Sequence, residues 1–312
     1  MVAITISGAN GRAPSIAKKS FPLTIEVGPE DTVETIKKKV ATKCPKLYTS
    51  RQKLALKGAK AALTDELTVK DIGLASGGEL DIKDLGPQLG WRFVYFVEYL
   101  GPLLIHPLFY YLPQYIYGKA FEHSELQKYA YGMIMAHFVK REFETLFIHR
   151  FSHGTMPARN ILKNSGHYHI LSGLLLAGDL YRPGYGAAAS SMKNTIMSNP
   201  TFLNACLGAF TFFEISNLHT HLTQRNLRPA GTKTRAIPRG YGFNLVSCAN
   251  YFFEICAWTV VLVMTRSAAC ALFLGAGGFQ MAVWAAKKHK NYKKEFGKDY
   301  PKGRKAMIPF IF

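Results

Sequence analysis

The 312-residue sequence is poor in the residues that build disulfide frameworks and metal centres. It has five cysteines and no CxxC pair, so we predict neither a disulfide framework nor a zinc site. Its ten histidines include no adjacent His-His pair, a feature usual in membrane di-iron oxygenases. No metal site is therefore predicted. The first residues, MVAITISGAN, also lack the basic and then apolar layout of a signal peptide, so we expect a cytosolic N-terminus.

Acidic residues are scarce as well. The sequence has 20 Asp or Glu against 39 Lys or Arg, and its formal net charge is +19. Such a balance can indicate a nucleic-acid partner, but no nucleic-acid motif is present, and the basic residues cluster beside apolar segments. The tail 287–305 has nine Lys or Arg, and the loop 225–240 has five and no acid. We therefore predict no nucleic-acid binding, and we expect both segments on the cytosolic side of a membrane.

Long apolar runs are plentiful, and they divide the chain into two parts. Residues 1–84 are polar and charged, whereas residues 89–286 contain apolar runs of roughly 15 to 25 residues, the length that crosses a bilayer. An even number of spans would leave both termini cytosolic, as the charges suggest. A seventh span remains open. The six predicted spans are 89–112, 126–149, 166–180, 201–219, 242–265 and 267–286.

The polar N-terminal part has the pattern of a β-grasp domain. VAITISG and FPLTIEV alternate like paired strands, VETIKKKVATKC after Asp31 and Thr32 predicts a helix, and QKLALKG and GGELDIKDL predict two further strands. This order, and LTDELTVKDIGLASGGELDIK in particular, resembles ubiquitin-like domains. The predicted fold is α+β: a small ubiquitin-like β-grasp head (1–84) followed by an all-α multi-span membrane domain (85–312) with six or seven transmembrane helices. The head has no exposed Gly-Gly end, so we expect a docking or stabilising role for it rather than conjugation.

Polar residues inside the apolar runs are the candidate site residues. In VSCANYFFEICAW (246–258), Asn250 and Glu254 would lie one helical turn apart, with Tyr251 about 100° round the axis. A polar group at membrane depth needs a partner or a watery cavity, so the stretch predicts a site or a packed polar seam. Lys140 and Glu144, at i,i+4, could alternatively form a simple ion pair. The other candidates are Glu98, Arg141, Glu142, Glu214, Asn217, His219 and His221.

The basic loop 225–240 allows two interpretations. Its Arg and Lys side chains alternate with Pro and Gly, which can fold the loop over a cavity while guanidinium groups bind phosphates. It could equally be a cytosolic loop beside anionic lipid, and composition favours neither. The basic residues are Arg225, Arg228, Lys233, Arg235 and Arg239.

Several long strings carry a resemblance to a known family. NLRPAGTKTRAIPRG, VSCANYFFEI and the tail HKNYKKEFGKDYPKGRKAMIPFIF closely resemble the C-terminal region of the steroid 5α-reductase superfamily. FETLFIHRFSHGTMPARNILKN and the ubiquitin-like head are similar to its very-long-chain enoyl-CoA reductase branch. The resemblance implies a multi-pass enzyme of the endoplasmic reticulum membrane that uses NADPH to reduce trans-2-enoyl-CoA to saturated acyl-CoA, the last step of very-long-chain fatty acid elongation. Membrane lipid and other elongation enzymes would be its partners.

The resemblance also implies roles for individual residues. Tyr251 would donate the proton. Lys140 would lower the pKa of this donor or stabilise the enolate, and Glu144 and Glu98 would orient Lys140 or the substrate. The implied NADPH contacts are Asn217, His221, Arg228, Arg235, Asn250, Glu254, His289 and Tyr292.

Two positions depart from the steroid-reducing pattern. His221 stands where steroid reductases have an Asp, and Phe138 stands where they have a catalytic Tyr. The second change favours a thioester substrate. Two alternatives stay open: a 3-oxo-5α-steroid 4-dehydrogenase or polyprenal-type enone reductase of the same superfamily, and a non-enzymatic membrane scaffold with a ubiquitin-like docking head.

Overall fold

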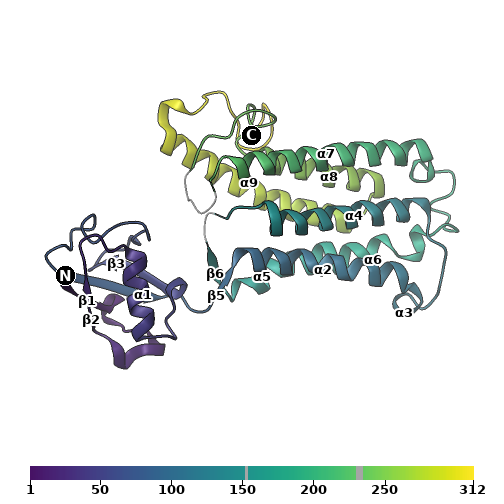
Figure 1. Ribbon diagram of the computed structural model, residues 1–312. Helices are drawn as coiled ribbons and strands as arrows, with labels where there is room; N and C mark the ends of the chain where they lie inside the picture. Colours follow the sequence, from purple (N-terminus) through teal and green to yellow (C-terminus); the bar gives the residue numbers. More distant parts are fainter. Residues whose placement is uncertain (152–153, 230–234) are drawn as a thin grey trace. The chain divides into compact units, whose positions relative to one another are not determined.

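The structure is a computed structural model that describes residues 1–151, 154–229 and 235–312. The chain forms two compact units, one built on a β-sheet and one on long helices (Figure 1). This confirms the predicted order of an N-terminal sheet domain and a mostly helical remainder. Lys233 of the predicted basic loop lies outside the described residues.

The first unit contains a four-stranded sheet and one helix. Its strands are β1 (Val2–Gly8), β2 (Leu23–Val27), β3 (Gln52–Leu56) and β4 (Gly78–Asp84), and its helix is α1 (Val33–Lys43). The sheet order is β2-β1-β4-β3, with β1 and β4 parallel and the other pairs antiparallel. This is the β-grasp order that the sequence predicted. A short ribbon of β5 (Gln88–Gly90) and β6 (Thr155–Pro157) belongs to the same unit.

Alternating apolar residues explain why this sheet covers the helix. Ile4 and Ile6 on β1 are fully buried, while residues between them face outward. Ile36 and Val40 lie one turn apart on α1 and are buried in the same core. Thr32 caps the helix, because its side chain accepts a hydrogen bond from the Thr35 backbone N–H.

A bidentate ion pair joins the last strand of the sheet to the turn before β3. Arg51 Nε donates to Asp84 Oδ1 at 2.9 Å, and Arg51 Nη2 donates to Asp84 Oδ2 at 2.6 Å. Burial alone would raise the pKa of the Asp84 carboxyl, but the hydrogen bonds from Arg51 and Gly86 outweigh it, and the net pKa is lowered. The pair therefore stabilises the sheet in the pH range where Asp84 is ionised.

This pair predicts a pH dependence of the head. A lowered carboxyl pKa contributes stability above the unfolded value of about 4, and that stability is lost as the pH falls through the folded pKa. Hydrogen exchange of the β4 amides in the full chain, corrected for intrinsic rates, should show protection decreasing below about pH 4. Asp84→Asn should have less protection at pH 7 and a flatter pH profile. Identical profiles would contradict the assignment.

The second unit is a bundle of long helices that lie side by side (Figure 1). Two π-helical stretches, Glu144–Ile148 and His167–Leu175, continue α4 and α5. The helices are α2 (Trp91–Tyr111), α3 (Pro113–Ile116), α4 (Glu125–Phe143), α5 (Asn160–Gly166), α6 (Leu176–Leu180), α7 (Pro200–Asn226), α8 (Ala249–Thr265) and α9 (Ala268–Phe296).

All six predicted spans fall on helices, but some boundaries were wrong. The fifth was expected to begin at residue 242, whereas α8 begins at Ala249. Gly240 and Gly242 have positive φ, and the backbone N–H groups of Ser247 and Cys248 bond to the C-terminal segment. The residues before α8 are therefore a loop held by the tail. Helices α7 and α9 each run beyond the predicted ends.

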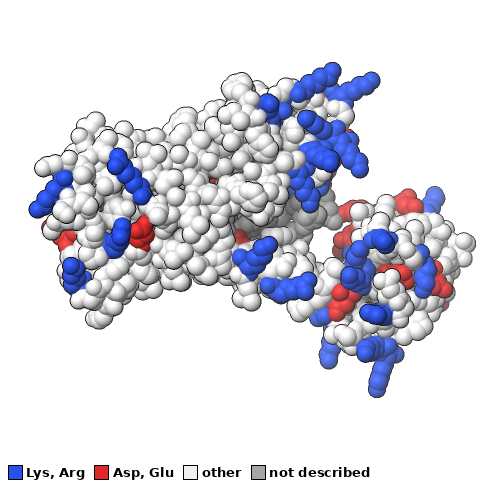
Figure 2. Space-filling view, turned by 180° about the vertical axis from the view of Figure 1, so that it is seen from behind, with Lys and Arg blue, Asp and Glu red and all other residues white. Residues whose placement is uncertain are grey.

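Two helices in the described part of the chain are long and apolar enough to cross a membrane, Trp91–Tyr111 and Ala268–Asp299. Helix α8 is apolar but shorter. Figure 2 shows the middle of the helical unit almost free of charged side chains on this face, with Lys and Arg gathered at its ends. Helices α4 and α7 are less apolar because they carry the polar residues that occupy the interior of the bundle.

Candidate functional site

The helical unit contains a cavity of about 470 Å³ at the end of the bundle where α7 finishes and α8 begins. It receives side chains from α2, α4, α7, α8 and α9 and from the segments that follow α4 and α7. Its lining residues are Tyr95, Arg141, His149, Arg150, Phe151, His221, Gln224, Arg225, Leu227, Arg228, Arg235, Ala236, Asn250, Tyr251, Trp284, Lys287, Lys288, Asn291 and Tyr292.

The Lys and Arg side chains that line this cavity make it positively charged. Seven Lys or Arg line it, and no Asp or Glu does so among the residues that the structure describes. Some of the guanidinium groups are held in place: Arg228 Nη1 donates to the Arg150 backbone oxygen at 3.1 Å, and Arg235 pairs with Glu295 at 3.2 Å. A concave site lined by fixed cations suits a ligand with several phosphates.

Asn217 on α7 connects three helices beneath the cavity. Its Oδ1 accepts a hydrogen bond from Lys140 Nζ on α4 at 2.5 Å. Its Nδ2 donates to the Asn250 backbone oxygen at 2.9 Å and to Glu254 Oε2 at 3.2 Å, both on α8. Because all its polar atoms are engaged, Asn217 fixes the start of α8 against α4 and α7.

Two carboxylates and an imidazole extend this network into the bundle. Lys140 Nζ lies 3.0 Å from Glu214 Oε2, and His137 Nδ1 lies 2.8 Å from Glu214 Oε1. His137 Nε2 lies 3.4 Å from Glu254 Oε1. Each charge of this network therefore has an opposite or titratable partner, as burial requires.

Arg141 connects the network to the cavity. Its Nη2 donates to the Tyr99 hydroxyl at 2.6 Å, and its Nη1 donates to Glu144 Oε2 at 2.7 Å. Glu144 is fully buried, and its Oε1 lies 3.0 Å from His221 Nδ1 and 3.3 Å from Lys140 Nζ. The Lys140–Glu144 ion pair predicted from the sequence thus exists, but as one contact in a larger set.

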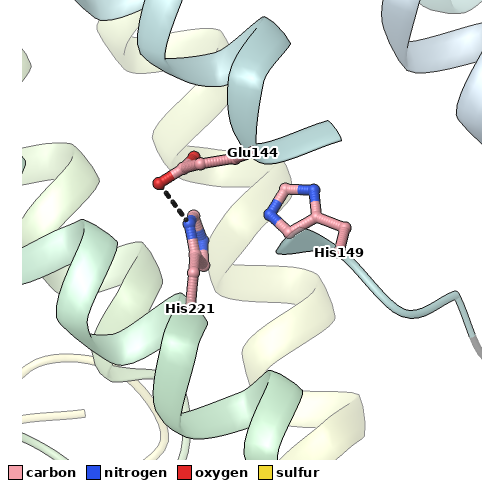
Figure 3. A group of neighbouring side chains, drawn as sticks. All are labelled: Glu144, His149 and His221. Carbon is pink, nitrogen blue, oxygen red and sulfur yellow. Dashed lines mark ion pairs between the residues drawn. The ribbon is translucent and has the colours of Figure 1, made fainter. Parts of the chain in front are cut away.

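Glu144, His149 and His221 form the group that most resembles a metal site (Figure 3). One ligand atom from each lies within 4.8 Å of the others, and the two imidazoles face the carboxylate from different segments. Arg141 and Lys140 already contact this carboxylate, so a divalent ion would meet two positive charges at close range. The arrangement favours an ion-pair network over a metal centre.

Tyr251 and Asn250, at the start of α8, both line the cavity. Tyr251 packs against a small buried cluster (Cys248, Ala285, Ala306 and Met307), and its hydroxyl forms no hydrogen bond with any described residue. Phe138 lies elsewhere: it is fully buried in the bundle core near Tyr99 and Trp258. The aromatic hydroxyl that steroid reductases carry at that position has no counterpart there.

The structure brings together half of the predicted site residues in the cavity and places the others around it. Glu98 on α2 is buried and hydrogen-bonds with Asn164 on α5. His289 on α9 bonds to Ser247 Oγ, which also bonds to Tyr300, so it holds the tail rather than facing the cavity. His221, Arg228, Arg235, Asn250, Tyr251 and Tyr292 line the cavity, whereas Glu98, Lys140, Glu144, Asn217, Glu254 and His289 do not.

Other residues of the site were not assigned from the sequence. Arg141 had been one charge among several in a polar stretch, and only the neighbouring Lys140 was given a role. Gln224, Lys287 and Lys288 were not singled out at all. Gln224 follows Asn217 and His221 at helical spacing on one face of α7, which is the one signal that could have found it.

Comparisons with known proteins show the family to which this chain belongs. Residues 154–312 match the family 3-oxo-5-alpha-steroid 4-dehydrogenase, and residues 17–84 match the family TECR, ubiquitin-like domain. The very-long-chain enoyl-CoA reductase of Dictyostelium discoideum is 38% identical over 294 residues, 90% of this chain and 92% of the relative. A trans-2,3-enoyl-CoA reductase-like protein of Mus musculus is 32% identical over 298 residues, 94% of this chain and 81% of the relative.

A candidate enoyl reductase of Schizosaccharomyces pombe is 48% identical over 249 residues, 80% of this chain and 81% of the relative. These matches cover 80% to 94% of this chain. Members of the family are membrane oxidoreductases that usually depend on a pyridine nucleotide. The chain belongs to the very-long-chain enoyl-CoA reductase family, a branch of the 3-oxo-5α-steroid 4-dehydrogenase superfamily.

Proposed function

We propose that this protein reduces trans-2-enoyl-CoA to saturated acyl-CoA with NADPH, as the last step of very-long-chain fatty acid elongation. The observation that carries the proposal is the basic cavity with Tyr251 on its wall. The relatives are named enoyl-CoA reductases, and these names support enoyl-CoA as the substrate. The absence of a hydroxyl at Phe138 favours a thioester substrate over a steroid enone.

The cavity residues fit NADPH. A pyrophosphate and a 2′-phosphate require several cations at fixed positions. Seven Lys or Arg line the cavity; two of them, Arg141 and Arg235, also pair with carboxylates that do not line it in the described structure. Arg228, Arg235 and Lys288 would bind these phosphates, and Tyr292 and Trp284 would provide aromatic surface for a ring. Asn250 would bind near the nicotinamide. Glu254 and Asn217 would act indirectly, because they hold the start of α8.

The residues of this chain supply binding, orientation and a proton. When bound, NADPH supplies the hydride that is added to C3 of the enoyl thioester. The Tyr251 hydroxyl is expected to protonate C2, since it lines the cavity and is not engaged by another described residue. Arg141, whose guanidinium is fixed by Tyr99 and Glu144, is available to stabilise the charge that develops on the thioester oxygen.

We assign Lys140, Glu144 and Glu98 supporting roles. Lys140 bridges Glu144, Glu214 and Asn217 and does not line the cavity, so it would position those groups rather than contact the enolate. Glu144 would hold Arg141 and His221, and Glu98 would orient groups between α2 and α5. His289 would hold the tail against α9 through Ser247, and so place Tyr292.

We further propose that residues 85–312 form the catalytic domain, embedded in the endoplasmic reticulum membrane by six or seven transmembrane helices, with both termini cytosolic. The nearly uncharged middle of the bundle in Figure 2 supports membrane embedding. The acyl chain would lie between helices beside membrane lipid. Residues 1–84 would form a ubiquitin-like domain that docks other enzymes of the elongation cycle.

The assay for this function is NADPH consumption by the purified protein with trans-2-hexadecenoyl-CoA, an enone steroid and a polyprenal as parallel substrates. We expect consumption with the enoyl-CoA alone. Turnover of the steroid or polyprenal in its place would assign the protein to another activity of the superfamily. Failure to bind or oxidise NADPH with any of them would favour a scaffold.

The cofactor assignment predicts different effects for two arginines of the same loop. Both are exposed, but only Arg235 lines the cavity. Arg235→Gln should raise the KM for NADPH roughly tenfold, since a charge-assisted hydrogen bond to phosphate is lost, and should leave kcat nearly unchanged. Arg239→Gln should change neither constant. Equal effects of the two substitutions in steady-state kinetics would count against a phosphate contact at Arg235.

A further inference from the structure

Gln224 on α7 makes a directed contact with one of the cavity residues. Its Nε2 donates a hydrogen bond to Asn250 Oδ1 on α8 at 2.9 Å. Both side chains line the cavity. Asn250 is also tied through its backbone, because its carbonyl oxygen accepts from Asn217 Nδ2 at 2.9 Å. Backbone and side chain of Asn250 are thus fixed by two residues of the same face of α7.

This contact determines which end of the Asn250 amide is free for a ligand. An amide has an acceptor oxygen and a donor nitrogen on opposite sides of one carbon, and either can face a partner if the group rotates. With Oδ1 engaged by Gln224, Nδ2 points away from it and has no acceptor among the described residues. Asn250 is 9% exposed and lines the cavity, so its unengaged Nδ2 can reach a ligand there.

We propose that Gln224 is a positioning residue that holds the Asn250 amide with its Nδ2 donor facing the cavity, where it binds the carboxamide oxygen of the nicotinamide. This inference rests on the proposed function, because it takes the cavity to bind NADPH with the nicotinamide near Asn250. Gln224 itself need not touch the ligand. Its effect is to exclude the rotated state, in which Asn250 would present an oxygen to another oxygen.

Two substitutions of similar length separate orientation from packing. A carboxylate at position 224 can only accept, so in Gln224→Glu the Asn250 amide should turn to donate Nδ2 to it, and Oδ1 would face the cavity. Gln224→Met keeps the length and volume but leaves the amide free to rotate. Asn226→Ala, an exposed position on the same helix, is the control.

The measurement is the Kd of each purified full-length variant for NADPH and for 2′-phospho-ADP-ribose, which has the phosphates but no nicotinamide. Gln224→Glu should raise the NADPH Kd about tenfold or more, since a hydrogen bond becomes a mismatched pair, and leave the other Kd within about twofold. Gln224→Met should raise the NADPH Kd about threefold, also selectively. Asn226→Ala should match the wild type for both ligands.

Four results would overturn the inference. One is an unchanged NADPH Kd in Gln224→Glu, and another is an equal loss for both ligands, which would indicate added negative charge or unfolding. If Gln224→Glu does not fold, Gln224→Met decides alone, and an unselective effect or none at all rejects the role. If the wild-type protein binds no NADPH, both the cofactor assignment and the inference about Gln224 are rejected. Wild-type protein that binds NADPH but does not reduce enoyl-CoA would reject only the substrate, because the Gln224 test is a binding test.

Discussion

Tyr251→Phe is expected to lower kcat for trans-2-hexadecenoyl-CoA by at least about 100-fold, the usual contribution of a positioned general acid. The substitution removes one oxygen atom from the cavity wall and leaves the ring against the buried cluster that contains Cys248 and Ala285. Since the hydroxyl bonds to no described residue, its loss leaves no protein group without a partner. The NADPH Kd and the thermal stability should therefore stay close to those of the wild type.

Steady-state kinetics and NADPH binding, measured on the same preparation, distinguish a proton donor from a packing residue. Tyr292→Phe is a suitable comparison, because Tyr292 is another phenol of the cavity wall. It should change kcat by far less than Tyr251→Phe. A Tyr251→Phe protein that reduces enoyl-CoA at the wild-type rate would remove Tyr251 from the chemistry.

Glu144→Gln should be the most destabilising single-charge change in the helical unit. Glu144 is fully buried and contacts Arg141 at 2.7 Å, His221 at 3.0 Å and Lys140 at 3.3 Å. Removing the carboxylate leaves two buried cations without their shared partner, which costs about 3–5 kcal/mol. The thermal unfolding midpoint in detergent should fall by on the order of 10 °C, and activity at saturating substrate should fall with it because Arg141 loses its anchor.

Glu142→Gln provides a control two residues away on the same helix. Glu142 is also buried, but neither of its carboxylate oxygens has a hydrogen-bond partner in the described structure. Neutralising it removes no ion pair, so its unfolding midpoint should stay near or above that of the wild type. If Glu142→Gln were the more destabilising of the two, the network around Glu144 would not be the stabilising element described here.

The head could be predicted from the sequence because its information is local. Alternation around Ile4 and Ile6, the cap at Thr32 and the spacing of Ile36 and Val40 each report directly on the element that they form. The start of α8 could not be predicted in the same way. Residues 242–248 are apolar enough to continue a helix, but hydrogen bonds to the distant C-terminal segment keep them in a loop.

The candidate site depends on contacts between helices, which no single stretch reveals. Adjacent residues on α4 have different roles: Arg141 reaches the cavity, whereas Lys140 points toward Glu214 and Asn217. Helical spacing placed both in the same polar stretch, and both contact the nearby Glu144. The partners that distinguish them come from helices far away in the sequence: Tyr99 for Arg141, and Glu214 and Asn217 for Lys140. For the same reason, the sequence could not show that His289 bonds to Ser247 Oγ.

The most direct test of the central claim is the isotopic composition of the product. Purified protein is given trans-2-hexadecenoyl-CoA with NADPH deuterated at C4 of the transferred side, and in a second reaction with unlabelled NADPH in D₂O. We predict saturated acyl-CoA with one deuterium at C3 in the first reaction and one at C2 in the second, by mass spectrometry. Recovery of the unreacted enoyl-CoA, or of product without label at C3, would contradict reduction by NADPH in this cavity.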